Sequence, residues 1–78
     1  MIIKVLGPGC NNCRRLERNV IEAVERLSLD ATVVKVTDLE EMMQYGMLGS
    51  PGLVVDDKLV SVGKVLSTNE IINLIKGS

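Results

Sequence analysis

The chain lacks histidine, tryptophan and phenylalanine, and it has only one tyrosine and two cysteines among its 78 residues. A structural zinc site normally takes four cysteine or histidine ligands, so one chain cannot close such a site without carboxylates or a second chain. Nucleic-acid binding typically combines a basic face with stacking aromatic rings. With a formal net charge of −1 and almost no aromatic residues, the sequence gives that function no support.

Long apolar runs are also missing. No stretch approaches the roughly 18 residues of a membrane span, and the N-terminal MIIKVLGPG has no apolar segment long enough for a signal peptide. We therefore expect a cytoplasmic protein that has no membrane partner. Thiols are mostly kept reduced in that compartment, so a nearby pair of cysteines there is more typical of catalysis or metal binding than of a structural disulfide.

Aliphatic residues, in contrast, are abundant. Hydrophobic residues make up 46 % of the chain, which is far more than a disordered protein contains. The length fits one small domain, residues 1–78, whose core consists of valine, isoleucine, leucine and methionine. No repeat, linker or low-complexity segment divides it.

The hydrophobic pattern predicts seven elements in the order β-α-β-α-β-β-α. The expected strands are 1–6, 32–36, 53–55 and 59–62, and the expected helices are 11–27, 39–45 and a last helix from Ser67 or Thr68 to Gly77. The β-α-β opening implies a parallel pair with a right-handed crossover. A turn at Asp56–Lys58 adds a hairpin, so we expect an α/β fold with a mixed sheet.

Both cysteines lie where the first strand meets the first helix, in the run Gly9-Cys10-Asn11-Asn12-Cys13. Unpaired N–H groups and the helix dipole stabilise a thiolate there and lower a cysteine's pKa below its free value of about 8.5. Cys13 lies one turn further and can resolve a mixed disulfide formed by Cys10. The alternatives are a thiolate site for a soft metal such as Cu(I) and two inert core thiols.

Two kinds of basic residue flank the thiols. Arg14 and Arg15 oppose the helix dipole, so they either support a thiolate or lie on a solvated face where Arg14 and Arg18 pair with Glu17 and Glu22. Lys4 is a charge within an apolar strand. It either acts as an electrostatic or proton-transfer partner of the thiols, or extends its head to water at the strand edge.

The segment Gly49-Ser50-Pro51-Gly52 precedes the third expected strand. A proline is tolerated there because the missing N–H costs least at a strand's first residues, and X–Pro bonds are where cis peptides occur. A cis Ser50–Pro51 bond would leave the Ser50 backbone free to pair with an extended peptide. The alternative is an ordinary trans turn proline.

These features together resemble a minimal thioredoxin-fold protein of the redox-active disulfide type, over nearly the whole chain. The resemblance rests on the Cys10–Cys13 run, Ser50-Pro51 before a hairpin, and Gly63 before the last helix. It implies a four-stranded mixed sheet with helices on both faces. It also implies Cys10 as nucleophile, Cys13 as resolving cysteine, and a cis-Pro51 loop that binds the substrate backbone.

The sequence departs from familiar thioredoxins and glutaredoxins at several positions. Gly9 stands where thioredoxins have tryptophan, Asn11-Asn12 replaces Gly-Pro or Pro-Tyr, and Lys4 occupies the position of a buried acid. The sequence therefore leaves the reductase unidentified. We expect a monomeric thiol–disulfide oxidoreductase that reduces protein disulfides and needs no cofactor or metal, and the alternative is a metal-binding or adaptor module with the same thiols.

Overall fold

The computed structural model describes residues 1–9, 11–46 and 50–76. Its elements follow the predicted order: β1 (Ile2–Leu6), α1 (Asn11–Arg26), β2 (Thr32–Val36), α2 (Leu39–Gln44), β3 (Gly52–Val55), β4 (Lys58–Val62) and α3 (Thr68–Lys76). The predicted boundaries are wrong by at most one residue wherever they fall in this part of the chain. The predicted end of the last helix at Gly77 lies outside the described residues.

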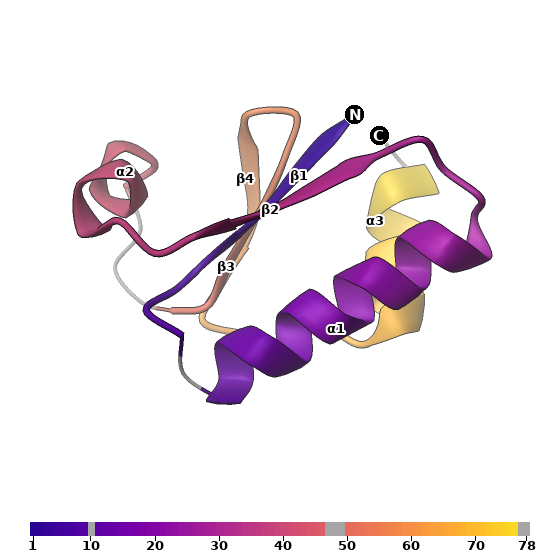
Figure 1. The fold of residues 1–78 in the computed structure, drawn as a ribbon, viewed down its shortest axis with the longest axis horizontal. Coiled ribbons are helices and arrows are strands. Elements are labelled where there is room, and N and C mark those ends of the chain that lie inside the picture. Colours follow the sequence, from indigo (N-terminus) through magenta and orange to yellow (C-terminus); the bar gives the residue numbers. More distant parts are fainter. Residues whose placement is uncertain (10, 47–49, 77–78) are drawn as a thin grey trace.

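The strands form one mixed sheet in the order β2-β1-β3-β4 (Figure 1). β1 pairs in parallel with β2, and β3 runs antiparallel to both β1 and β4. Val5 shows the register at the centre, because it lies between Lys35 on β2 and Leu53 on β3. The prediction of an α/β fold with a four-stranded mixed sheet is confirmed.

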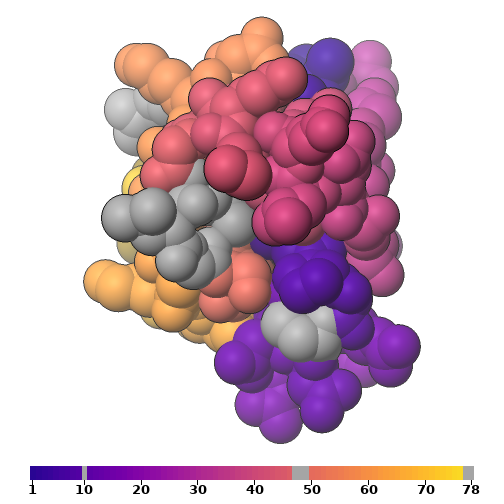
Figure 2. Space-filling model, turned by 90° about the vertical axis from the view of Figure 1, so that its left-hand side faces the viewer, coloured from indigo at the N-terminus to yellow at the C-terminus, as the bar shows by residue number. Residues whose placement is uncertain are grey.

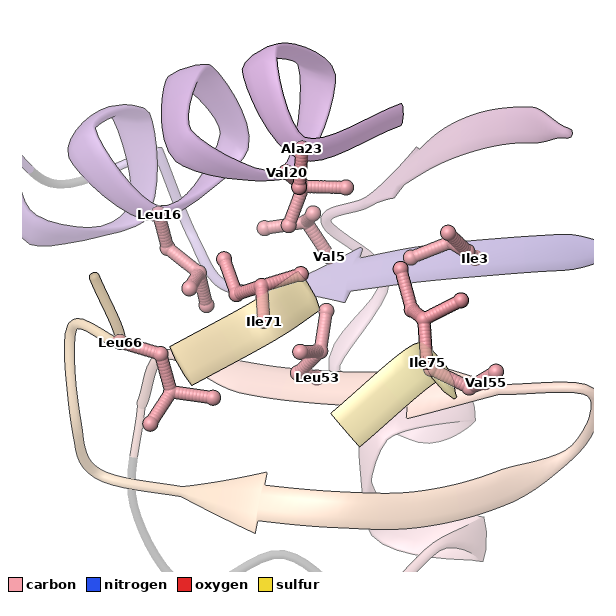
Figure 3. Close-up of a cluster of buried hydrophobic side chains, with 10 residues drawn as sticks. All are labelled: Ile3, Val5, Leu16, Val20, Ala23, Leu53, Val55, Leu66, Ile71 and Ile75. Atoms are coloured by element: carbon pink, nitrogen blue, oxygen red, sulfur yellow. The ribbon is translucent and has the colours of Figure 1, made fainter. Parts of the chain in front are cut away.

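Helices cover both faces of this sheet. Alternate residues of β1 point to opposite sides, so that Ile3 and Val5 pack under α1 and α3 (Figure 3) whereas Leu6 packs with Met42 of α2. The larger cluster comprises buried aliphatic side chains from both layers: Ile3, Val5, Leu16, Val20, Ala23, Leu53, Val55, Leu66, Ile71 and Ile75. The helix α1 lies along the sheet with its N-terminal end beside the end of β1 (Figure 1).

Local capping signals set the ends of the two shorter helices. Ser67 and Glu70 form a reciprocal capping box on α3, in which the Ser67 hydroxyl accepts from the Glu70 N–H and the Glu70 carboxylate accepts from the Ser67 N–H. Asp38 caps α2 by accepting from the Glu40 N–H. Gly46, at φ 72°, ends α2 with a hydrogen bond from its N–H to the Met43 carbonyl.

The hairpin between β3 and β4 is tighter than the sequence predicts. Lys58 belongs to β4, so only Asp56 and Asp57 form the loop, and both have positive φ, as a type I′ turn requires. The pairing of β3 with β4 shifts between Leu53 and Val54, which leaves Val60 as an extra residue on the edge strand. An irregularity of this kind interrupts the edge and discourages pairing with another chain.

Candidate active site

Cys13 is the cysteine whose surroundings the structure describes, because Cys10 lies outside the described residues. Cys13 is the third residue of α1 and is 1 % exposed. It therefore lies in the first helical turn, where backbone N–H groups have no partner within the helix. The predicted roles of Cys10 stay predictions, and Cys13 supplies the local geometry.

Gly7 lies against Cys13 at the end of β1. A Cβ atom at Gly7 would overlap Cys13 Sγ and would lie 3.1 Å from Cys13 Cβ. The Gly7 N–H donates to the Val36 carbonyl at 2.9 Å, which extends the pairing of β1 with β2 by one residue. This bond holds Gly7 in place, and the missing side chain gives the sulfur its room.

Pro51 is the third residue at this point. The same Cβ position at Gly7 lies 4.0 Å from Pro51 Cα, so the end of β1, the start of α1 and the start of β3 meet here. Pro51 is buried, its peptide bond with Ser50 is cis, and its carbonyl accepts the Gly63 N–H at 2.8 Å. Ser50 is exposed, and its backbone has no hydrogen bond to another described residue.

Lys4 does not extend from a sheet edge, because β1 is an interior strand with partners on both sides. That expectation is wrong. Alternation along β1 places Lys4 on the α2 face, where its Nζ donates to the Tyr45 hydroxyl at 3.2 Å and lies 5.7 Å from the ring centroid. The hydrogen bond with Tyr45 is the main cause that raises the pKa of Lys4 above its ordinary value.

The basic residues at the start of α1 are not neutralised in the way that a solvated, ion-paired face requires. Glu22 pairs with Arg26, at 2.7 Å, so the expected pairing of Arg18 with Glu22 is wrong. Arg14, Arg15 and Arg18 are exposed, and their side chains make no ion pair or hydrogen bond with any described residue. Figure 2 shows the violet N-terminal turns of α1 protruding at the lower border of this face.

The described part of the chain offers no cluster of side chains that would favour the metal-binding alternative. No group of three or more histidine, cysteine, aspartate or glutamate residues lies close enough there to hold an ion. In the same residues, no helix is long and apolar enough to cross a membrane.

Two residues of this region have contacts that the sequence does not signal. Gly7 is part of the quoted Gly-Pro-Gly run, but that run indicates only that a strand stops, and not that a sulfur fills the space beside it. Tyr45 was expected in α2, and its pairing with Lys4 joins residues 41 positions apart. Nothing in a single sequence signals such a contact.

Comparison with known proteins gives consistent results. A family profile described as thioredoxin domain matches residues 1–76. The chain is 41 % identical over 71 residues to a thioredoxin of Methanothermobacter thermautotrophicus. The matched segment covers 91 % of this chain and 92 % of that protein. The chain is equally similar to a thioredoxin of Methanocaldococcus jannaschii, over 91 % of this chain and 81 % of that protein.

Solved structures extend the likeness to the fold. A malaria-parasite thioredoxin-2, described as a component of protein secretion machinery, superposes with a TM-score of 0.74 at 18 % identity, covering 99 % of this chain and 82 % of that one. A second malarial protein superposes with a TM-score of 0.69 at 18 % identity, covering 97 % and 93 %. At this identity the likeness concerns the fold alone.

Proposed function

Since the chain belongs to the thioredoxin family and is a thiol–disulfide oxidoreductase, we propose that Cys10 is its attacking thiol and Cys13 its resolving thiol. The observation that carries this assignment is the position of Cys13. Its side chain is buried in the first turn of α1, beside Gly7 and near Pro51. A buried second thiol is protected from solution oxidants and reacts only with a partner brought to it, as a resolving cysteine must.

The reaction takes place in two exchange steps. The Cys10 thiolate attacks one sulfur of a substrate disulfide, so that a Cys10–substrate bond forms, the substrate bond breaks, and the other substrate sulfur leaves as thiolate. The substrate thiolate released in the first step takes the proton of Cys13, and the Cys13 thiolate then attacks the Cys10 sulfur. The Cys10–Cys13 disulfide forms and the second substrate thiolate leaves, so the substrate gains the two electrons that the protein loses.

The Ser50–Pro51 segment supports a role in holding the substrate. Pro51 has no N–H and its carbonyl is engaged by Gly63, whereas the exposed Ser50 backbone has no partner among the described residues. An extended peptide that pairs with Ser50 would bring its disulfide to the same end of the sheet as the start of α1.

The cellular setting follows from the same chemistry. The electrons reside on the two sulfurs, so the cycle needs no bound cofactor, and a reductase or small thiol must regenerate the dithiol. We place this cycle in the cytoplasm, where such reductants keep thiols reduced. We propose protein disulfides as the substrates and a monomer as the working form.

Trapping the intermediate tests these roles. Cys13→Ser should accumulate a covalent complex with insulin, used here as a disulfide substrate, because the mixed disulfide at Cys10 can no longer be resolved. Cys10→Ser should form no complex and should reduce no insulin. A complex that forms only through Cys13 would reverse the two roles, and wild-type protein that purifies with a stoichiometric thiolate-bound metal and reduces no insulin would favour the metal-binding alternative.

A further inference from the structure

We propose that Arg14, Arg15 and Arg18 form a basic docking surface, here called the arginine patch, that selects disulfide substrates with acidic residues beside the reacting bond. This inference rests on the proposed function, because it names the class of protein that the Cys10–Cys13 site serves. It predicts that substrates with the same disulfide are reduced at different rates when only the charge of the flanking residues differs.

The charges of the patch are available to a partner. All three arginines are exposed, and no described side chain neutralises them. The other end of the same helix shows the contrast, because Arg26 bonds Glu22 at 2.7 Å and Glu22 also accepts from the Thr68 hydroxyl at 3.2 Å. Glu22 is therefore used for contacts within the protein, and Glu17, the one acid between the patch arginines, makes no ion pair with any described residue.

The three charges also gather in the N-terminal half of the helix. Arg14 and Arg18 are four positions apart and Arg15 and Arg18 three, so their side chains are neighbours on the helix surface. Arg14 and Arg15 follow Cys13 directly, and the first turn contains no acidic residue. The positive end of the helix dipole adds to the same field.

Stability does not account for this arrangement. Basic side chains at a helix N-terminus oppose the dipole, and like charges three or four residues apart repel one another, each effect typically costing about 0.2–1 kcal/mol. The whole chain has a formal charge of −1, so the patch is a local concentration of positive charge on a slightly acidic protein. A field of this kind speeds the encounter with a partner of opposite charge and repels a partner of like charge.

A protein segment fits the patch better than a nucleic acid does. The described surface offers one tyrosine, whose hydroxyl is engaged by Lys4, and so no set of rings on which bases stack. Aspartate and glutamate beside a disulfide require only exposed guanidinium groups, which bind carboxylates through paired N–H donors.

Three disulfide peptides provide the test. They share one core with an intramolecular disulfide and carry three flanking glutamates, glutamines or lysines. The pre-reduced protein is mixed with each, and the second-order rate constant of reduction is measured at low and at physiological salt. We expect the glutamate peptide to react about tenfold faster than the glutamine peptide at low salt, the lysine peptide to react more slowly, and added salt to compress these ratios.

Two triple variants of equal net charge identify the patch. Arg14→Gln/Arg15→Gln/Arg18→Gln should lose the preference, whereas Arg26→Gln/Lys58→Gln/Lys76→Gln should keep it. The ratio between peptides removes any effect of the arginines on thiol reactivity, because that effect is common to all three. Equal rates for all peptides with wild-type protein, or equal loss in both variants, would overturn the patch while leaving the oxidoreductase intact. Failure to reduce even the glutamine peptide would overturn both.

Discussion

The backbone of Gly7 lies directly against the sulfur of Cys13, with no space for a Cβ atom between them. Gly7→Ala should therefore destabilise the fold by about 1–3 kcal/mol, which is the usual cost of overpacking a buried site. It should also slow resolution of a mixed disulfide, because Cys13 has to move. Denaturant unfolding in excess reductant measures the first effect, and single-turnover reduction of insulin measures the second.

A double-mutant cycle assigns that cost to the sulfur. In a Cys13→Ala background the overlapping atom is gone, so Gly7→Ala should cost clearly less there than in the wild-type chain. A similar cost in both backgrounds would show that the strain lies in the Gly7 backbone and not in its contact with Cys13.

The Lys4–Tyr45 hydrogen bond predicts a stability difference that depends on pH. Because this bond raises the pKa of Lys4, the charged lysine stabilises the folded state fully below its unfolded pKa of about 10.4, and this contribution is lost as the pH rises through the folded pKa. The gap in unfolding free energy between wild type and Lys4→Met should therefore stay constant near neutral pH and narrow in strong alkali. In a Tyr45→Phe background the narrowing should be clearly smaller, because only the weaker attraction of Glu41 and Asp57 then raises the pKa of Lys4. An unchanged narrowing there would contradict the role of the Tyr45 hydroxyl.

Asn19 fastens α1 to the segment before α3, since its Nδ2 donates to the Leu66 carbonyl at 2.8 Å in a partly buried contact. Asn19→Ala should lower the unfolding free energy by about 1–2 kcal/mol, because it leaves that carbonyl without its donor. Asn73→Ala, an exposed asparagine on α3 without such a bond, should change stability by less than about 0.5 kcal/mol. Equal losses in the two variants would contradict this role.

The hairpin offers a stabilising change. Asp57 has φ 67°, a conformation that glycine adopts without the penalty of a side chain, so Asp57→Gly should stabilise the protein by up to about 1 kcal/mol. Asp56→Gly should gain less, because the Asp56 carboxylate accepts the Ile2 N–H at 3.0 Å. Thermal unfolding of both variants ranks them, and the reverse order would refute this reading of the turn.

Local signals explain why the fold is largely predictable from the sequence. The capping residues Asp38 and Ser67, the paired aspartates of the hairpin and the aliphatic stripe of α1 each act within a few residues. Long-range placement is different. The sequence suggests that the Lys4 ammonium group reaches solvent at an edge of the sheet. The sheet order places β1 between two strands instead, and this explains why Lys4 bonds to Tyr45.

The site divides in the same way. A cysteine pair at a strand–helix join is visible from spacing alone, because the helix N-terminus gives it a chemical reason. The contact of Gly7 with Cys13 and the proximity of Pro51 are different, because they depend on the end of β1, the start of α1 and the start of β3 meeting in space. The partner of Glu22 could have been predicted, because an acid four residues before a base is the better order on a helix, and this order favours Arg26 over Arg18.

The most direct test of the central claim is the rate of Cys10 alkylation against pH, measured by site-resolved mass spectrometry on the reduced protein and followed by titration of the Cys10–Cys13 pair in a redox buffer. We predict a Cys10 pKa clearly below about 8 and a reversible disulfide with one defined potential, for which roughly 30 mV corresponds to a tenfold change in equilibrium. A Cys10 pKa near the free value of about 8.5, with no disulfide between the two cysteines at any buffer ratio, would contradict it.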